Sequence, residues 1–190
     1  MDFTLDGTTL TVLGIVVILA AILIGWWIVR RRHSHGLKKT FGPEYDHEVE
    51  AAGGRTKAEK TLDDRQRRVK EYELRELSSV DREAFSARWR DVQKGFVDHP
   101  SQAVEEAALL IDEAMERRGY PLGEIQQKEA DLSVHHPQEV QDYRHAHAIA
   151  VRNRRGEATT EDLREATLRY RNLFEHLVGL DERAHMETAT

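Results

Sequence analysis

Apolar positions along the chain follow two patterns, and the first is a continuous run from Leu10 to Val29. Seventeen of its twenty positions are Ala, Val, Ile, Leu or Trp. At 1.5 Å of rise per residue, a helix of this length spans about 30 Å, the hydrocarbon thickness of a bilayer. The run therefore predicts a transmembrane helix over residues 10–29.

The charges that flank this run predict its orientation. Asp2 and Asp6 precede it, and a basic cluster follows it. Because basic residues collect on the cytoplasmic side, we expect the inner (plasma) membrane, a single pass, the N-terminus outside and the C-terminal domain in the cytoplasm. The cluster also allows contact with anionic lipid, although most such clusters only set the topology; its members are Arg30, Arg31, Arg32, Lys38 and Lys39. Within the run, Ala21 and Gly25 lie one turn apart and would allow two helices to approach closely.

The second pattern is a helical repeat of apolar residues at intervals of three and four, which dominates residues 78–180. Long helices are expected after Ser78 or Ser79, from Pro100, from Pro137 and after Thr159 or Thr160, with Gly and Pro at their ends. A shorter helix is expected over residues 122–130. Since no stretch alternates as a strand does, the fold class is all-α: an N-terminal transmembrane helix followed by a cytoplasmic helical bundle of about five helices.

The remaining segments complete the predicted organisation. Gly and Pro interrupt the segment after the apolar run, and Lys57 begins a charged stretch with few apolar positions. The domains are therefore an extracytoplasmic N-terminus over 1–9, the transmembrane helix over 10–29, a juxtamembrane basic segment and linker over 30–56, a charged helix over 57–77, the bundle over 78–180 and a flexible tail over 181–190.

Composition narrows the classes of partner and chemistry. The chain has a formal charge of −6, and the part from Arg30 onward has 28 basic and 32 acidic residues, so its charge is −4. Charges of both signs alternate, and nucleic-acid binding, which needs a basic face, is not expected. The chain has no cysteine, which excludes disulfides, thiolate nucleophiles and Cys-ligated metals.

Histidines are the main candidates for chemistry. His147 lies on the apolar face of its expected helix, and His136 precedes the helix that contains Glu139. A buried imidazole can bind a metal or move a proton, but a lone core histidine more commonly hydrogen-bonds a neighbour. The spacing typical of zinc-binding helices is absent. We therefore expect no cofactor and favour a protein that is not an enzyme.

Several segments resemble a family of bacterial single-span membrane proteins that has no assigned activity. The resemblance covers most of the chain after the apolar run, and it implies the architecture without implying any catalytic or binding residue. The segments that carry it are Phe41-Gly-Pro-Glu-Tyr-Asp46, Trp89-x-x-Val-Gln93 with Phe96-Val-Asp98-x-Pro100, Arg118-Gly-Tyr-Pro121, Ala130-Asp-Leu-Ser-Val134 with His136-Pro137, and Tyr143-Arg144-x-Ala-His147.

These patterns predict a membrane-tethered helical module that binds a cytoplasmic protein or further copies of itself. The expected docking surface consists of aromatic and histidine side chains outside the main helices: Phe41, Tyr45, Tyr120, His135 and His136. The alternative is a small membrane-bound, metal-dependent enzyme or sensor that uses His136, Glu139 and His147.

Overall fold

The computed structural model describes the backbone of residues 7–180 and the side chains of residues 15–180. The described chain is all-α, and it contains no strand. This confirms the all-α class and the helical bundle, whereas the predictions for residues 1–6 and 181–190 lie outside the described residues. The described residues form eight helices: α1 (Gly7–Phe41), α2 (Pro43–Ala51), α3 (Arg55–Lys70), α4 (Ser79–Gly95), α5 (Pro100–Arg118), α6 (Ile125–His135), α7 (Glu139–Arg154) and α8 (Thr160–Val178).

The predicted transmembrane helix is wrong. Among the described residues, no helix combines the length and the apolar character that crossing a bilayer requires. The described side chains of the apolar run, residues 15–29, cover only about 22 Å before Arg30 begins a basic stretch. The single pass, the inner-membrane location, the orientation and the membrane as a partner all depended on that span and are corrected with it.

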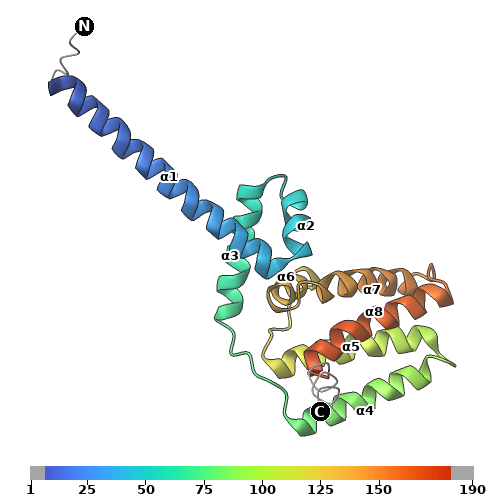
Figure 1. Cartoon of the computed structure of the whole chain (residues 1–190). Helices are drawn as coiled ribbons and strands as arrows, with labels where there is room; N and C mark the ends of the chain where they lie inside the picture. The colour runs from blue at the N-terminus through green and yellow to red at the C-terminus, as the bar shows by residue number, and fades with distance from the viewer. Residues whose placement is uncertain (1–6, 181–190) are drawn as a thin grey trace, which may run out of the picture.

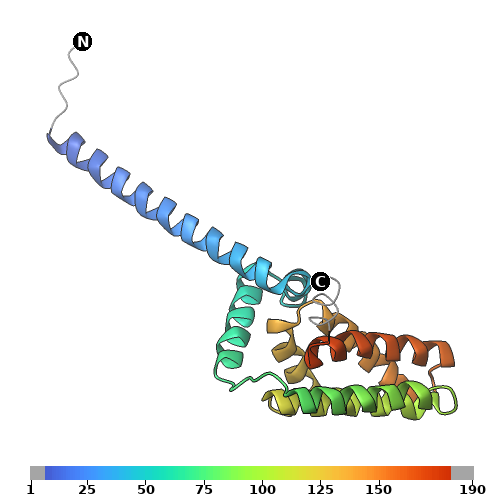
Figure 2. The same ribbon diagram turned by 60° about the horizontal axis from the view of Figure 1, so that its bottom comes forward.

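Helices α4 to α8 form the bundle, in which α8 packs against both α5 and α7 while α4 packs against α5 (Figures 1 and 2). Their apolar faces share one core, and Trp89 of α4 stacks on Phe174 of α8 with ring centroids 4.6 Å apart. The bundle therefore joins its first and last helices directly.

Local end signals explain where these helices begin and end. The side chain of Ser78 accepts a hydrogen bond from the backbone of Asp81, and Thr159 forms a reciprocal capping box with Asp162. Gly119 and Gly179 end α5 and α8 in the left-handed conformation. The main difference is α6, which begins at Ile125 and extends to His135, five residues beyond the expected end.

The segment expected to be a linker is largely helical. Helix α1 continues through the basic cluster to Phe41, Gly42 breaks the chain with φ 48°, and Pro43 begins α2. Helices α2 and α3 then pack beside the end of α1 around a second, small core formed by Leu37, Phe41, Tyr45 and Leu62. The chain thus has an N-terminal unit (α1–α3) and a bundle (α4–α8), and α6 contacts α1 and α3 as well as α7.

An extended connection over residues 71–78 joins the two units. The backbone N–H of Arg75 donates to the carbonyl of Arg118, 2.9 Å away, and fixes this connection against the end of α5. Gly119 has φ 94°, and a Cβ atom there would lie 2.6 Å from the carbonyl oxygen of Glu73. The close approach of two backbones therefore requires glycine at this position.

Candidate functional site

The boundary between the N-terminal unit and the bundle contains the most elaborate polar cluster of the described residues. Its centre is Glu44 in the first turn of α2, with a fully buried side chain. The Arg144 guanidinium donates two hydrogen bonds to this carboxylate, at 2.6 and 2.8 Å. Arg65 donates from 2.9 Å and Gln141 from 2.8 Å. One carboxylate of α2 is thereby held by donors from α3 and α7.

Further carboxylates complete the pairing of these two arginines. Arg65 also pairs with Glu48, and Arg144 donates from Nε to Glu129 at 3.0 Å. We call Glu44, Glu48, Arg65, Glu129 and Arg144 the charged junction. It carries three acidic and two basic groups, and every one is ion-paired within the junction.

A second buried carboxylate strengthens the same boundary. Asp131 of α6 is 1% exposed. It accepts hydrogen bonds from Arg68 at 3.0 and 2.8 Å, from the Tyr72 hydroxyl at 2.8 Å and from Gln127 at 2.8 Å. The side chains of α3 and of the chain just after it are therefore fixed to the bundle by charge-assisted hydrogen bonds.

The electrostatics of Glu44 identify its role. Burial alone would raise the pKa of its carboxyl, but the hydrogen bonds and positive charges of Arg144 and Arg65 outweigh burial and lower the pKa below its ordinary value. Glu44 is therefore ionised at neutral pH, with its oxygen atoms occupied by donors. Such a group is suited to fixing two units against each other and poorly suited to accepting a substrate proton.

The residues predicted to form a docking surface do not lie together on the outside. Phe41 and Tyr45 are buried in the small core of the N-terminal unit, and Tyr120 is buried in the bundle against Tyr72. His136 is nine-tenths buried, whereas His135 is exposed. Phe41 and Tyr45 therefore pack against other residues of this chain.

The five basic residues predicted to contact lipid are all exposed along α1. Two of them have partners inside the N-terminal unit, because Arg30 donates to the Thr56 hydroxyl at 2.8 Å and Lys38 donates to Asp46 at 3.0 Å. Arg30 also lies over the ring of Trp26, 5.3 Å from its centroid. These contacts explain the placement of Arg30 and Lys38 by intramolecular pairing.

The three residues of the metal hypothesis have separate surroundings. Glu139 lies 3.2 Å from Nε2 of His176, and His147 stacks on Tyr143 beside a cleft of about 330 Å³. Burial, followed by the charges of Arg118, His135 and His176, lowers the pKa of His136 to about 3. Within residues 15–180, no group of three or more His, Asp or Glu side chains is placed to hold a metal ion.

Comparisons with known proteins do not identify a family for this chain. The chain matches no protein family. No curated protein is significantly similar to it, and no solved structure matches its fold significantly. The resemblance noted from the sequence segments therefore remains a prediction.

Sequence reasoning missed the charged junction, although two of the segments quoted for the resemblance meet there and a third lies beside it. Glu44 comes from the first, Asp131 beside the junction comes from a later one, and Arg144 comes from the last. The available signal was an acidic residue directly after a Gly-Pro break and next to two aromatics. That signal gives no partner, because Glu44 and Arg144 are 100 residues apart.

Proposed function

We propose that the protein is a non-catalytic helical interaction module, and that the apolar part of α1 is the surface through which two copies associate. The observation that carries the proposal is the exposure of every residue from 15 to 29. Eleven Ile, Leu, Val and Trp residues in this stretch are more than half exposed, for example Leu23 at 63% and Trp26 at 58%. A continuous apolar surface of this extent is typical of an interaction site.

The shape of the molecule supports this assignment. Helix α1 projects away from the other helices in both views, so its apolar part is accessible from all sides (Figures 1 and 2). Its basic end is fixed to α3, because His33 lies 2.9 Å from Asp63 and Ser34 donates to Glu59 at 2.6 Å. A rigid base that presents an uncovered helix is an arrangement suited to binding.

A second copy of the chain fits this surface because one face of α1 has small side chains. Ala21 and Gly25 lie one turn apart, and a Cβ atom added at Gly25 would have no neighbour within 4 Å. Small side chains let two helix backbones approach closely, and a two-fold axis through them would bury the same patch on both copies.

The test uses the full chain, whose lack of cysteine permits single-cysteine crosslinking. Gly25→Cys places a thiol at the expected axis, and mild oxidation should give a covalent dimer. The matched control is Leu23→Cys, because two residues away on a helix is nearly the opposite face. We expect this control, at a position that is 63% exposed, to crosslink at least tenfold less.

Association without a thiol is checked by analytical ultracentrifugation of the wild-type chain and of Gly25→Leu. The bulkier side chain should weaken dimerisation at least tenfold, because it separates the two backbones. Equal crosslinking of both cysteine variants contradicts the proposal, as does a wild-type chain that stays monomeric. Flotation of a monomeric chain with lipid vesicles contradicts it too, since the apolar surface would then be covered by lipid.

A further inference from the structure

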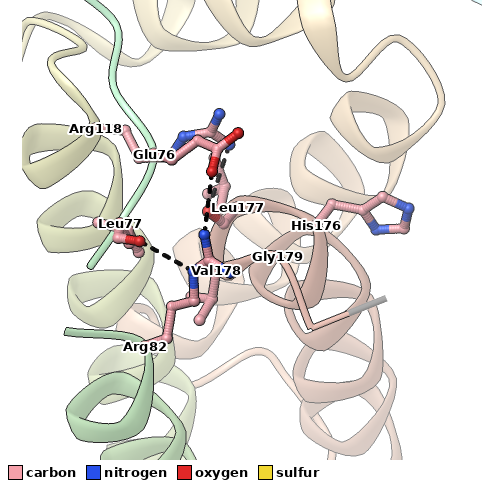
Figure 3. A pocket seen from close by; sticks show the side chains of 8 residues that line it. All are labelled: Glu76, Leu77, Arg82, Arg118, His176, Leu177, Val178 and Gly179. Carbon is pink, nitrogen blue, oxygen red and sulfur yellow. Dashed lines mark hydrogen bonds and ion pairs between the residues drawn. The ribbon is translucent and has the colours of Figure 1, made fainter. Parts of the chain in front are cut away.

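We propose that a cavity between the start of α4 and the ends of α5 and α8 is a binding site for a small oxyanion, a carboxylate or phosphate group, held by Arg82 and Arg118. The cavity has a volume of about 60 Å³ and is separate from the charged junction. Figure 3 shows both guanidinium groups among the side chains around it. The lining residues are Glu76, Leu77, Arg82, Arg118, His176, Leu177, Val178 and Gly179.

Arg118 is a cation whose hydrogen-bonding capacity is largely unused. Its Nε atom is buried and has no partner among the described residues. Its one hydrogen bond there is long, 3.4 Å from Nη1 to the carbonyl oxygen of Leu177. The partly buried Arg65 and Arg144, by contrast, both have carboxylate partners. A buried charged donor without an acceptor is costly, and an oxyanion would supply that acceptor.

Arg82 provides the second positive group and is already held in place. Its Nε donates to the carbonyl oxygen of Leu77 at 3.0 Å, which leaves the terminal nitrogens directed at the cavity (Figure 3). The carboxylate of Glu76 lies 3.3 Å from Nη2 of Arg82, but the Glu76 side chain is 83% exposed. An ion pair this exposed is weak. Glu76 therefore marks where a carboxylate fits and is readily displaced by a ligand.

The charge of Arg118 also acts on three titratable groups beside the cavity. Burial first, and then the Arg118 charge, lower the pKa of both His135 and His136. The same charge opposes the increase that burial causes in the pKa of Tyr120. Three neighbouring groups thus experience a positive field from this side chain, and a bound anion would neutralise it.

The size and the chemistry of the cavity limit which ligands it can bind. A single water requires roughly 10–15 Å³ of such space, so the cavity accommodates a group of a few heavy atoms and excludes a nucleotide or a sugar. Guanidinium forks bind the paired oxygens of carboxylates and phosphates. Leu77 and Val178 provide apolar walls that a short aliphatic carboxylate would contact and that inorganic phosphate would not use. The two sources of the oxyanion can therefore be distinguished by experiment.

The test is a titration of the full chain with sodium acetate, sodium butyrate or sodium phosphate at constant ionic strength maintained with NaCl. Binding is followed by the side-chain Nε–H resonances of arginine in ¹⁵N-labelled protein and by calorimetry. We expect saturable binding that shifts the Arg118 Nε–H resonance, because this donor gains an acceptor. Butyrate binding more tightly than acetate identifies an aliphatic carboxylate, whereas phosphate binding more tightly than both identifies a phosphate group.

Variants assign the binding to this cavity. Arg118→Gln should weaken binding at least tenfold, and Glu76→Gln should tighten it severalfold by removing the competing carboxylate. Arg88→Gln is the matched control, because Arg88 is exposed and paired with Glu113 elsewhere on the surface, and it should leave the affinity unchanged. If Arg118→Gln does not fold, the Glu76→Gln comparison and Arg118→Lys, which keeps the charge but loses the fork, still decide the question. Absence of saturable binding, or equal affinity of the wild type, the Glu76 variant and the Arg118 variant, overturns the proposal.

Discussion

Among single residues, Glu44 has the largest expected effect on stability. Glu44→Gln removes the negative charge and leaves the arginine groups of Arg65 and Arg144 without their shared partner. Breaking a buried pair in this way costs about 3–5 kcal/mol of unfolding free energy, measured by urea denaturation. Glu113→Gln breaks an exposed pair with Arg88 and should cost less than about 1 kcal/mol. Equal losses in the two variants would contradict the role assigned to the charged junction.

Gly119 should respond to substitution more strongly than a glycine with a similar backbone conformation. Gly119→Ala introduces a Cβ atom 2.6 Å from a backbone oxygen at φ 94°, and the combined conformational strain and steric overlap should cost about 3 kcal/mol. Gly156 has φ 73° with open space around it, so Gly156→Ala isolates the conformational part at about 1 kcal/mol. Thermal unfolding of both variants measures the difference, and similar melting temperatures would contradict the close approach.

His136 should make stability depend on pH in the weakly acidic range. Burial lowers its pKa from 6.5 to about 3, so the unfolded chain binds more protons than the folded chain between these values. The free energy of unfolding therefore falls as the pH decreases from 6.5 towards 3. This group contributes a loss of about 2 kcal/mol between pH 7 and pH 5.

The His136→Gln variant isolates that contribution when urea unfolding is measured at pH 7 and pH 5. The variant should lose less stability than the wild type over this interval. Titration of Glu44 does not interfere with the comparison. Its pKa is lowered, so the stability that its ionised carboxylate contributes is lost below pH 4.5. A pH dependence that the substitution leaves unchanged would show that His136 is protonated equally in both states.

At the scale of elements, the capping box of α8 gives a local prediction. Thr159→Ala removes the hydroxyl that accepts from the backbone of Asp162 and should reduce the unfolding free energy by about 1 kcal/mol. Thr160→Ala, one residue later and already inside the helix, keeps the cap and should change stability by less than about 0.5 kcal/mol. Chemical denaturation followed by circular dichroism compares them, and the reverse order of stability would contradict the cap.

The bundle helices were predictable because their signals are local. Ser78, Pro100 and Thr159 are start signals, and Gly119 and Gly179 are stop signals, all within one turn of the helix ends. The apolar spacing between these points depends only on the helical repeat. Sequence reasoning therefore identified every helix of the bundle, and its largest error there was the length of α6.

The N-terminal unit was not predictable by the same reasoning, since its stability comes from contacts between elements. The sequence around Gly42 and Gly53 predicts a linker, whereas in the structure Gly42 separates α1 from α2 and Gly53 separates α2 from α3, both with positive φ. The buried faces of α2 and α3 have few apolar positions, because these helices bury charged groups such as Glu44 and Glu59 alongside apolar ones. A buried face that contains paired charges cannot be recognised from the pattern of hydrophobic residues.

At the scale of the whole molecule, the two cores predict that the bundle folds on its own and that the N-terminal unit does not. Every residue of the larger core lies between Tyr72 and Leu180, so a fragment of residues 71–180 should remain folded with a cooperative thermal transition. A fragment of residues 30–70 has only about 40 residues and a core of four side chains, and chains of this size rarely fold without staples. Circular dichroism of both fragments tests this, and a stable 30–70 fragment or an unfolded 71–180 fragment would contradict the division.

The length of α1 converts small rotations at its base into large displacements at its far end. About 33 Å of helix separate Leu37, which is packed in the small core, from Ile15. A tilt of α1 by 10° about Leu37 would therefore move Ile15 by about 6 Å, comparable to the rise of a full helical turn. The packing of the base of α1 on α2 and α3 therefore determines where the apolar surface of residues 15–29 is presented.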